Sequence, residues 1–185
     1  MIVTKNSFYE ILRLAHSPLL FVVVPENKRS KKEHQEVFEK VRNEWLEQGL
    51  CQPGEDKKLI PSFEFRRMLY DFKRAFTVLE WWENGRKRQF VRLPVNVMEI
   101  SLVRNQIQLE NKSFQEFSAW AWKLVADKKK GKLMVHVLKE NQALTTKTRD
   151  LDFNENVKQG EKILAEMLYL FCNGEHAVKE REMYE

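Results

Sequence analysis

Two apolar runs separated by a tight-turn sequence constrain the fold of this chain most. Thr77–Trp82 and Gln89–Leu93 are rich in β-branched and aromatic residues, and Glu83-Asn84-Gly85 lies between them. Asn-Gly readily adopts the positive φ angles of a type I′ turn, so the two runs predict a β-hairpin. A second hairpin is predicted around Asn105. The fold therefore contains antiparallel strands.

Apolar residues recur at helical spacing on both sides of these hairpins. Ser113 and Glu116 form a capping box at the start of one helix, and Gly131 lies just past its end. Gly49 is expected to end an earlier helix that Ser30 caps, with Leu50 folding back on its last turn. The predicted helices span about 6–14, 31–48, 61–76, 113–128 and 154–171, and the further strands 19–24, 95–103, 107–109, 133–138 and 141–150.

These elements predict an α+β fold in which antiparallel hairpins form a central sheet packed with amphipathic helices. Helices and hairpins recur in both halves, so pseudo-symmetry between two halves stays open. No low-complexity linker divides the chain, and residues 1–185 are predicted to form a single domain with a charged, frayed tail at 175–185.

Composition favours a cytoplasmic protein that is not inserted in a membrane. The longest apolar run, Leu19–Val24, is far shorter than the roughly 20 residues that span a bilayer, and no secretion signal precedes it. Cys51 and Cys172 lie far apart and suggest no disulfide framework. The net charge of +5 fits an acidic partner, but 27 acidic residues interleaved with 32 basic ones dilute the field, so the charge is weak evidence for nucleic acid. Nucleic acid is predicted to be an unlikely partner.

The chain carries no phosphate-binding loop, nucleophile elbow or zinc-protease motif, so neither an enzyme nor a cofactor is expected. Cys172 and His176 have a helical i, i+4 spacing, but two ligands without a third do not indicate a metal site. His34 and His136 are interpreted as packing residues.

Side chains left over after core formation indicate a protein partner instead. Phe63, Arg67, Tyr70 and Arg74 recur on the side of their helix opposite the apolar stripe, and such residues are enriched at interfaces. The alternative is that this helix is sandwiched and that both aromatic rings are buried.

For two tryptophans as well, the sequence leaves open whether the ring is buried or binds a partner. Trp122 projects away from the apolar face of its helix, so either that helix packs on two sides or Trp122 is an anchor for a partner. Trp81 and Trp82 are consecutive strand residues that face opposite sides of the sheet, and Trp82 is the predicted partner-binding residue of the two.

Arg86-Lys87-Arg88 follows the tight turn after two helices, an order similar to a winged helix-turn-helix with a basic wing. Arg86 and Arg88 are therefore candidate partner-binding residues, and nucleic-acid binding is the alternative function. The long connection between Gly49 and Pro61 weighs against that alternative.

The order of elements, with Trp45-Leu46 to Gly49-Leu50 followed by Phe65, Met68-Leu69 and Phe72, resembles the EspG-type chaperones of type VII secretion. The resemblance implies a cytosolic adaptor that holds a helical secretion substrate, an LXG toxin or its small helical partner, and presents it for export. It also implies that the turn at 84–88 and the helix ending at Phe171 contact that cargo. An immunity protein that neutralises a toxin stays open beside it.

Overall fold

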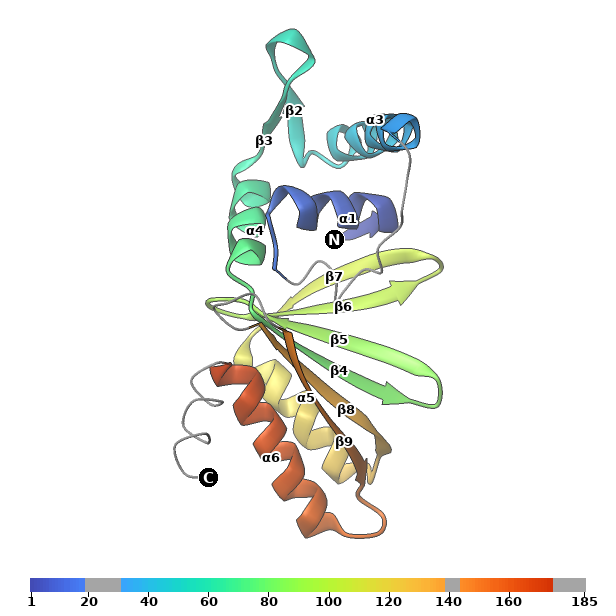
Figure 1. The fold of residues 1–185 in the computed structure, drawn as a ribbon, viewed down its shortest axis with the longest axis vertical. Helices are drawn as coiled ribbons and strands as arrows, with labels where there is room; N and C mark the ends of the chain where they lie inside the picture. The colour runs from blue at the N-terminus through green and yellow to red at the C-terminus, as the bar shows by residue number, and fades with distance from the viewer. Residues whose placement is uncertain (19–30, 139–143, 175–185) are drawn as a thin grey trace. The chain divides into compact units, whose positions relative to one another are not determined.

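The computed structural model describes residues 1–18, 31–138 and 144–174, which form the predicted α+β structure (Figure 1). The helices are α1 (Lys5–Leu14), α3 (Lys31–Glu47), α4 (Phe63–Lys73), α5 (Phe114–Ala126) and α6 (Val157–Asn173), with a short 3-10 helix η1 (Glu55–Lys57). The strands are β1 (Ile2–Thr4), β2 (Cys51–Pro53), β3 (Leu59–Pro61), β4 (Thr77–Glu83), β5 (Arg86–Arg92), β6 (Val97–Val103), β7 (Gln106–Lys112), β8 (Lys130–Leu138) and β9 (Leu144–Asp152).

Seven strands form one antiparallel sheet in the order β1-β7-β6-β5-β4-β8-β9, while β2 and β3 pair in a separate small hairpin. The predicted β4–β5 hairpin is confirmed: Asn84 and Gly85 have φ values of 50° and 73°, and Glu83 pairs with Arg86 directly beside the turn. Because β4 also pairs with β8, this hairpin lies in the interior of the sheet.

By its internal contacts the chain divides into two compact units. Unit 1 comprises Met1–Arg74 with Leu102–Gln108, and unit 2 comprises Ala75–Ser101 with Leu109–Glu185. Each unit has an aromatic core of its own.

The core of unit 1 is built around Trp45, where α1, α3 and α4 meet (Figure 1). The Trp45 ring lies 5.1 Å from the Phe65 ring, and Phe8 meets Phe72 edge to face at 6.0 Å. Such edge-to-face pairs add to the stabilisation that burial of the rings already provides. This packing fixes the inner side of α4.

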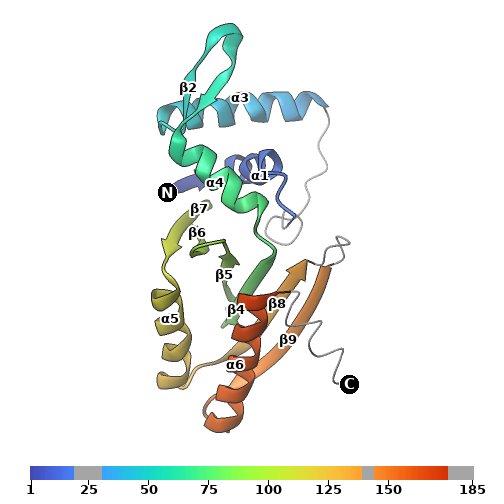
Figure 2. The same ribbon diagram turned by 90° about the vertical axis from the view of Figure 1, so that its left-hand side faces the viewer.

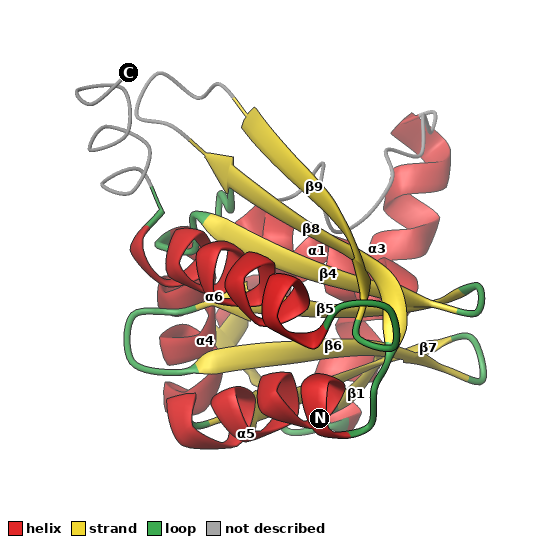
Figure 3. Ribbon diagram, turned by 90° about the horizontal axis from the view of Figure 1, so that it is seen from below, coloured by secondary structure: helices red, strands yellow, loops and turns green. Residues whose placement is uncertain are grey.

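The core of unit 2 lies between the sheet and the helices α5 and α6, which run over the same face of the strands (Figures 2 and 3). Phe117 of α5 contacts Phe90 of β5 at 5.2 Å and Phe171 of α6 at 5.1 Å between ring centroids. Leu79 and Trp81 of β4 complete this cluster. The apolar faces predicted for the two helices therefore meet a common strand surface.

Several helix ends differ from the predictions. The cap of α1 is Thr4, whose hydroxyl accepts a hydrogen bond from Ser7 N, so the helix begins at Lys5, one residue before the predicted start. Helix α4 begins at Phe63 with Ser62 as its cap, and not at Pro61 as predicted, because Pro61 lies in β3. The predicted end at Phe76 is also wrong, because α4 ends at Lys73 and Phe76 is 39% exposed beyond it.

The end of α5 and the strand after it are set by Lys128 and Gly131. The capping box of Ser113 and Glu116 is confirmed, but the left-handed residue after α5 is Lys128, with φ 49°, and Gly131 lies in β8. The ending of α3 is confirmed: Gly49 has φ 67°, and Leu50 N donates to Trp45 O.

Short strands escaped the sequence patterns. Gln106–Gln108 in β7 pair with β1 at the N-terminus, and the linker before α4 contains the β2–β3 hairpin. Strands of three residues are too short to show an alternating pattern. The strand predicted at 19–24, the cap at Ser30 and the tail at 175–185 lie outside the described residues.

Candidate functional site

Helix α4 presents two different sides. Ser62 Oγ accepts from Phe65 N at 3.1 Å and starts the helix, and Phe65 and Phe72 bury one side in the core of unit 1. The opposite side carries the predicted partner-binding residues Phe63, Arg67 and Tyr70, and Arg74 follows as the C-cap residue, with its side chain on Tyr70. These four residues are here named the α4 stripe.

All four residues of the α4 stripe are exposed. Phe63 is 67% exposed and Tyr70 55%, so the alternative of a sandwiched helix is wrong. A single exposed aromatic residue is ordinary on a protein surface. Here two aromatic residues alternate with two arginines on one stripe, and these residue types are enriched at interfaces.

The side chains of Arg74 and Tyr70 hold each other in a fixed conformation. Arg74 Nη1 donates to the Tyr70 hydroxyl at 2.7 Å, and the guanidinium carbon lies 5.3 Å from the centroid of the Tyr70 ring. This contact restrains two long side chains that a partner would otherwise have to order at an entropic cost.

Trp122 and Trp82 of unit 2 are also accessible. Trp122 is 52% exposed on the side of α5 away from buried Phe117, so α5 does not pack on two sides there. Trp82 is 37% exposed, and its Nε1 donates to Glu80 Oε2 at 2.9 Å, whereas Trp81 is buried under the helices. The indole of Trp122 is thus the more exposed of the two.

The basic run after the turn lies within β5 and not in a loop as expected, because the two-residue turn brings Arg86 directly into register with β4. Lys87 Nζ lies 3.3 Å from Glu80 Oε1. Arg88 donates two hydrogen bonds to Glu99 Oε1, from Nε at 2.8 Å and from Nη2 at 2.5 Å. Two of these three cations are therefore paired with carboxylates of the sheet, which leaves fewer charges to contact phosphate groups.

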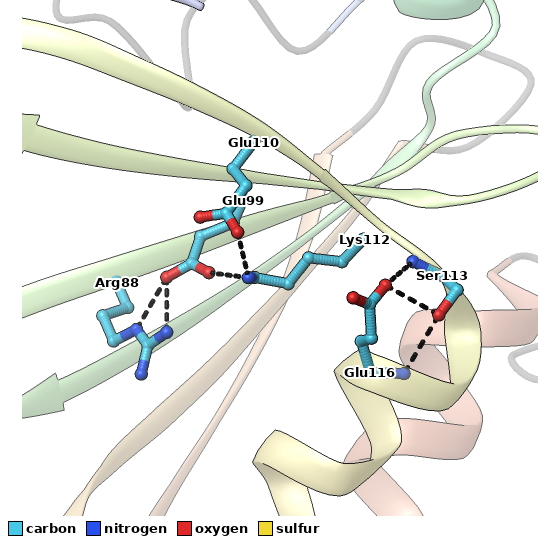
Figure 4. A network of polar contacts seen from close by, with 6 residues as sticks. All are labelled: Arg88, Glu99, Glu110, Lys112, Ser113 and Glu116. Atoms are coloured by element: carbon cyan, nitrogen blue, oxygen red, sulfur yellow. Dashed lines mark hydrogen bonds and ion pairs between the residues drawn. The ribbon is translucent and has the colours of Figure 1, made fainter.

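Arg88 belongs to a network that reaches β7 (Figure 4). Glu99, nearly buried, accepts from Arg88 on one oxygen and lies 3.2 Å from Lys112 Nζ through the other. The Arg88 guanidinium also lies 5.3 Å from the Trp120 ring. Its position is explained by neutralisation of Glu99, so Arg88 has a structural role beside the predicted binding role.

Glu80 is the centre of a second buried polar cluster, which the sequence patterns missed. Burial by itself raises the pKa of its carboxyl, but His136, Trp82 and Gln89 act the other way. Together with the charge of Lys87 they lower the pKa to about 2. A carboxylate with such a low pKa is a weak base at neutral pH, which favours a structural role.

His136 takes part in this cluster at a longer distance. Its Nδ1 lies 2.9 Å from Thr146 Oγ1, and its Nε2 lies 3.9 Å from Glu80 Oε2 without a hydrogen-bond partner. Both residues are more than nine-tenths buried. The interpretation of His136 as a packing residue agrees with this position. The sequence gives one indication of the cluster, an acidic residue inside an otherwise apolar strand.

A shallow groove of about 520 Å³ lies in unit 1 between the start of α1, α3 and the start of β7. Its Glu44 carboxylate accepts from Thr4 N at 2.8 Å and from Thr4 Oγ1 at 2.7 Å. That carboxylate is used to hold the beginning of α1 against α3.

Within 1–18, 31–138 and 144–174, no three His, Cys, Asp or Glu side chains gather as metal ligands. The spacing of Cys172 and His176 is not tested, because His176 lies outside that range. None of the described helices is long and apolar enough to cross a membrane. No family model matches this chain, and no curated protein compared with it matches either.

Proposed function

We propose that this protein is an adaptor or chaperone that binds a helical segment of another protein through the α4 stripe. The resemblance to EspG-type chaperones indicates which partner is bound and where in the cell. The partner is a type VII secretion substrate, an LXG toxin or its small helical companion, and it is held in the cytoplasm before export.

The exposure of Phe63 and Tyr70 on one side of α4 carries the proposal. Burial of apolar surface contributes about 25 cal/mol per Å². The two exposed aromatic rings would therefore stabilise a complex in which a partner covers them. The opposite side of α4 is fixed by buried Phe65 and Phe72. A partner therefore meets a rigid surface, which lowers the entropic cost of binding.

Unit 2 offers further anchors for the same kind of partner. Trp122 on α5 and Trp82 on β4 expose indole rings, and Arg86 is exposed beside the turn at Asn84. By the resemblance, the cargo contacts this turn and α6.

Co-purification tests the proposal. The tagged chain is co-expressed with each protein encoded beside its gene, and complexes are isolated by affinity and size-exclusion chromatography. We expect a stable complex with a helical protein, and we expect the double variant Phe63→Ser, Tyr70→Ser to lose it. The matched control is Ile60→Ser, because Ile60 is 54% exposed in β3 but lies off the stripe.

The proposal fails if the wild-type chain forms no stable complex with any of these proteins, or if the double variant binds as well as the control. The region of the partner that is bound distinguishes a chaperone from an immunity protein. Capture of an export region indicates a chaperone, whereas capture of a toxin domain together with protection from its toxicity indicates an immunity protein.

A further inference from the structure

The spacing of the α4 stripe describes the partner in more detail. Phe63, Arg67, Tyr70 and Arg74 are separated by four, three and four residues. At 3.6 residues per turn, this spacing keeps all four side chains within an arc of roughly 60° and extends them over about 16 Å along the axis. The stripe is therefore a narrow band almost parallel to the helix.

A band with alternating separations of three and four residues is the seam of a left-handed coiled coil. In such a seam each side chain packs between four side chains of a facing helix, and the helices cross at about 20°. An extended strand has no comparable fit, because the backbone groups in the middle of α4 are already hydrogen-bonded within the helix. The geometry of the stripe therefore favours a helix, and not an extended strand, as the bound segment.

The seam alternates between aromatic and cationic positions. Phe63 and Tyr70 stand seven residues apart, and Arg67 and Arg74 also stand seven residues apart. A facing helix brings apolar residues to the first pair and carboxylates to the second. Arginine favours this pairing because its planar fork binds a carboxylate through two hydrogen bonds.

The charged residues around the seam also favour an acidic partner. Exposed Arg66 and Lys73 lie along one edge of the stripe, and the acidic residues of α4, Glu64 and Asp71, lie along the other. With Arg67 and Arg74, this side has four cations and two carboxylates. None of the four cations forms an ion pair with a residue that the structure describes. The outer side of α4 thus presents a net positive charge that residues 1–18, 31–138 and 144–174 do not neutralise through ion pairs.

We infer that the segment that docks on the α4 stripe is an acidic amphipathic helix, with two carboxylates seven residues apart that face Arg67 and Arg74. This inference rests on the proposed function and names the chemistry of its partner. Opposite charge across the seam sets which helices are accepted, and the aromatic rings supply the apolar contact.

Two designed peptides of 21 residues test this inference on the intact protein. Both form amphipathic helices with leucines along the seam, and they carry either glutamates or lysines at the positions that face the arginines. Binding is measured by fluorescence anisotropy. We expect the glutamate peptide to bind about tenfold more tightly than the lysine peptide, and we expect its affinity to fall when salt is raised.

Charge reversal provides the decisive comparison. The double variant Arg67→Glu, Arg74→Glu should lose its preference for the glutamate peptide and bind the lysine peptide better. Both arginines are exposed, and an unchanged circular dichroism spectrum and melting temperature show that the variant is folded. Arg104→Glu is the control at an exposed arginine of the β6–β7 turn.

Equal binding of the two peptides, or no binding of either, overturns the inference. A duplex oligonucleotide that displaces the glutamate peptide at the same protein concentration also overturns it, in favour of nucleic acid. Failure here is distinguishable from failure of the proposed function. If a natural complex depends on Phe63 and Tyr70 but the peptides show no charge preference, the adaptor role stands and only the acidic helix is excluded.

Discussion

Trp45 Nε1 donates a hydrogen bond to Ser7 Oγ at 2.6 Å, and this contact joins α3 to α1 across 38 positions of the chain. Both residues are almost completely buried. The indole N–H therefore has no water to replace the hydroxyl, and the bond fixes how the two helices meet in the core of unit 1.

Replacement of Ser7 with alanine should lower the free energy of unfolding by about 1–3 kcal/mol, because it leaves a buried N–H without an acceptor. Urea denaturation followed by tryptophan fluorescence measures the change. Ser118→Ala, at an exposed position of α5, is the control and should have little effect. Equal stability of the two variants would show that the hydrogen bond contributes nothing.

Replacement of Glu80 with glutamine should reduce stability at neutral pH by about 1–3 kcal/mol, because Lys87 and the neighbouring donors lose a charged acceptor. The pKa of Glu80 is lowered from 4.5 to about 2 on folding. Its contribution is therefore fully present above pH 4.5 and is lost as the pH falls towards 2.

Unfolding free energies measured between pH 7 and pH 2 test this prediction. The wild-type chain should lose more stability over the window from pH 4.5 to 2 than Glu80→Gln does. Glu64→Gln, at an exposed site on α4, should follow the wild type. Parallel curves for wild type and Glu80→Gln would contradict the assignment.

Gly131 should not tolerate alanine. A Cβ atom at this position would overlap the backbone oxygen of Trp82 and lie 2.5 Å from Cζ2 of Trp81. A backbone atom and a buried indole cannot move aside, so we expect a loss of about 1–3 kcal/mol, as in other overpacked cores. The measurement is the shift in melting temperature.

The matched control for this substitution is Gly54→Ala. Its Cβ atom would lie 2.9 Å from Ile60 Cγ1, which belongs to an exposed side chain that can rotate away. If both variants melt at the same temperature, the close approach at Gly131 does not matter for stability.

Arg88→Ala should destabilise the fold by about 1–2 kcal/mol, because the nearly buried Glu99 carboxylate keeps only Lys112 as a charged partner. Arg86→Ala, two residues away at an exposed position, should leave stability unchanged. Thermal unfolding of the two variants separates a structural arginine from a surface one. A destabilised Arg86→Ala with an unaffected Arg88→Ala would reverse this assignment.

Local sequence determined the elements that depend on short-range chemistry. The turn at Asn84-Gly85, the capping box at Ser113 and the left-handed Gly49 all occur as predicted. Each depends on backbone geometry within a few residues, which the identities of those residues set directly. The exposed α4 stripe was also predictable, because helical periodicity separates it from Phe65 and Phe72.

Tertiary structure alone decided which side chains remain accessible and which charges are paired. Trp82 and Trp81 look alike in the sequence, but only Trp81 lies under α5 and α6. Arg88 was predicted to bind a partner, yet pairing of β5 with β6 brings Glu99 to it. Periodicity defines the faces of a helix or strand, whereas contacts between distant segments determine which face is covered, and no short stretch of sequence contains that information.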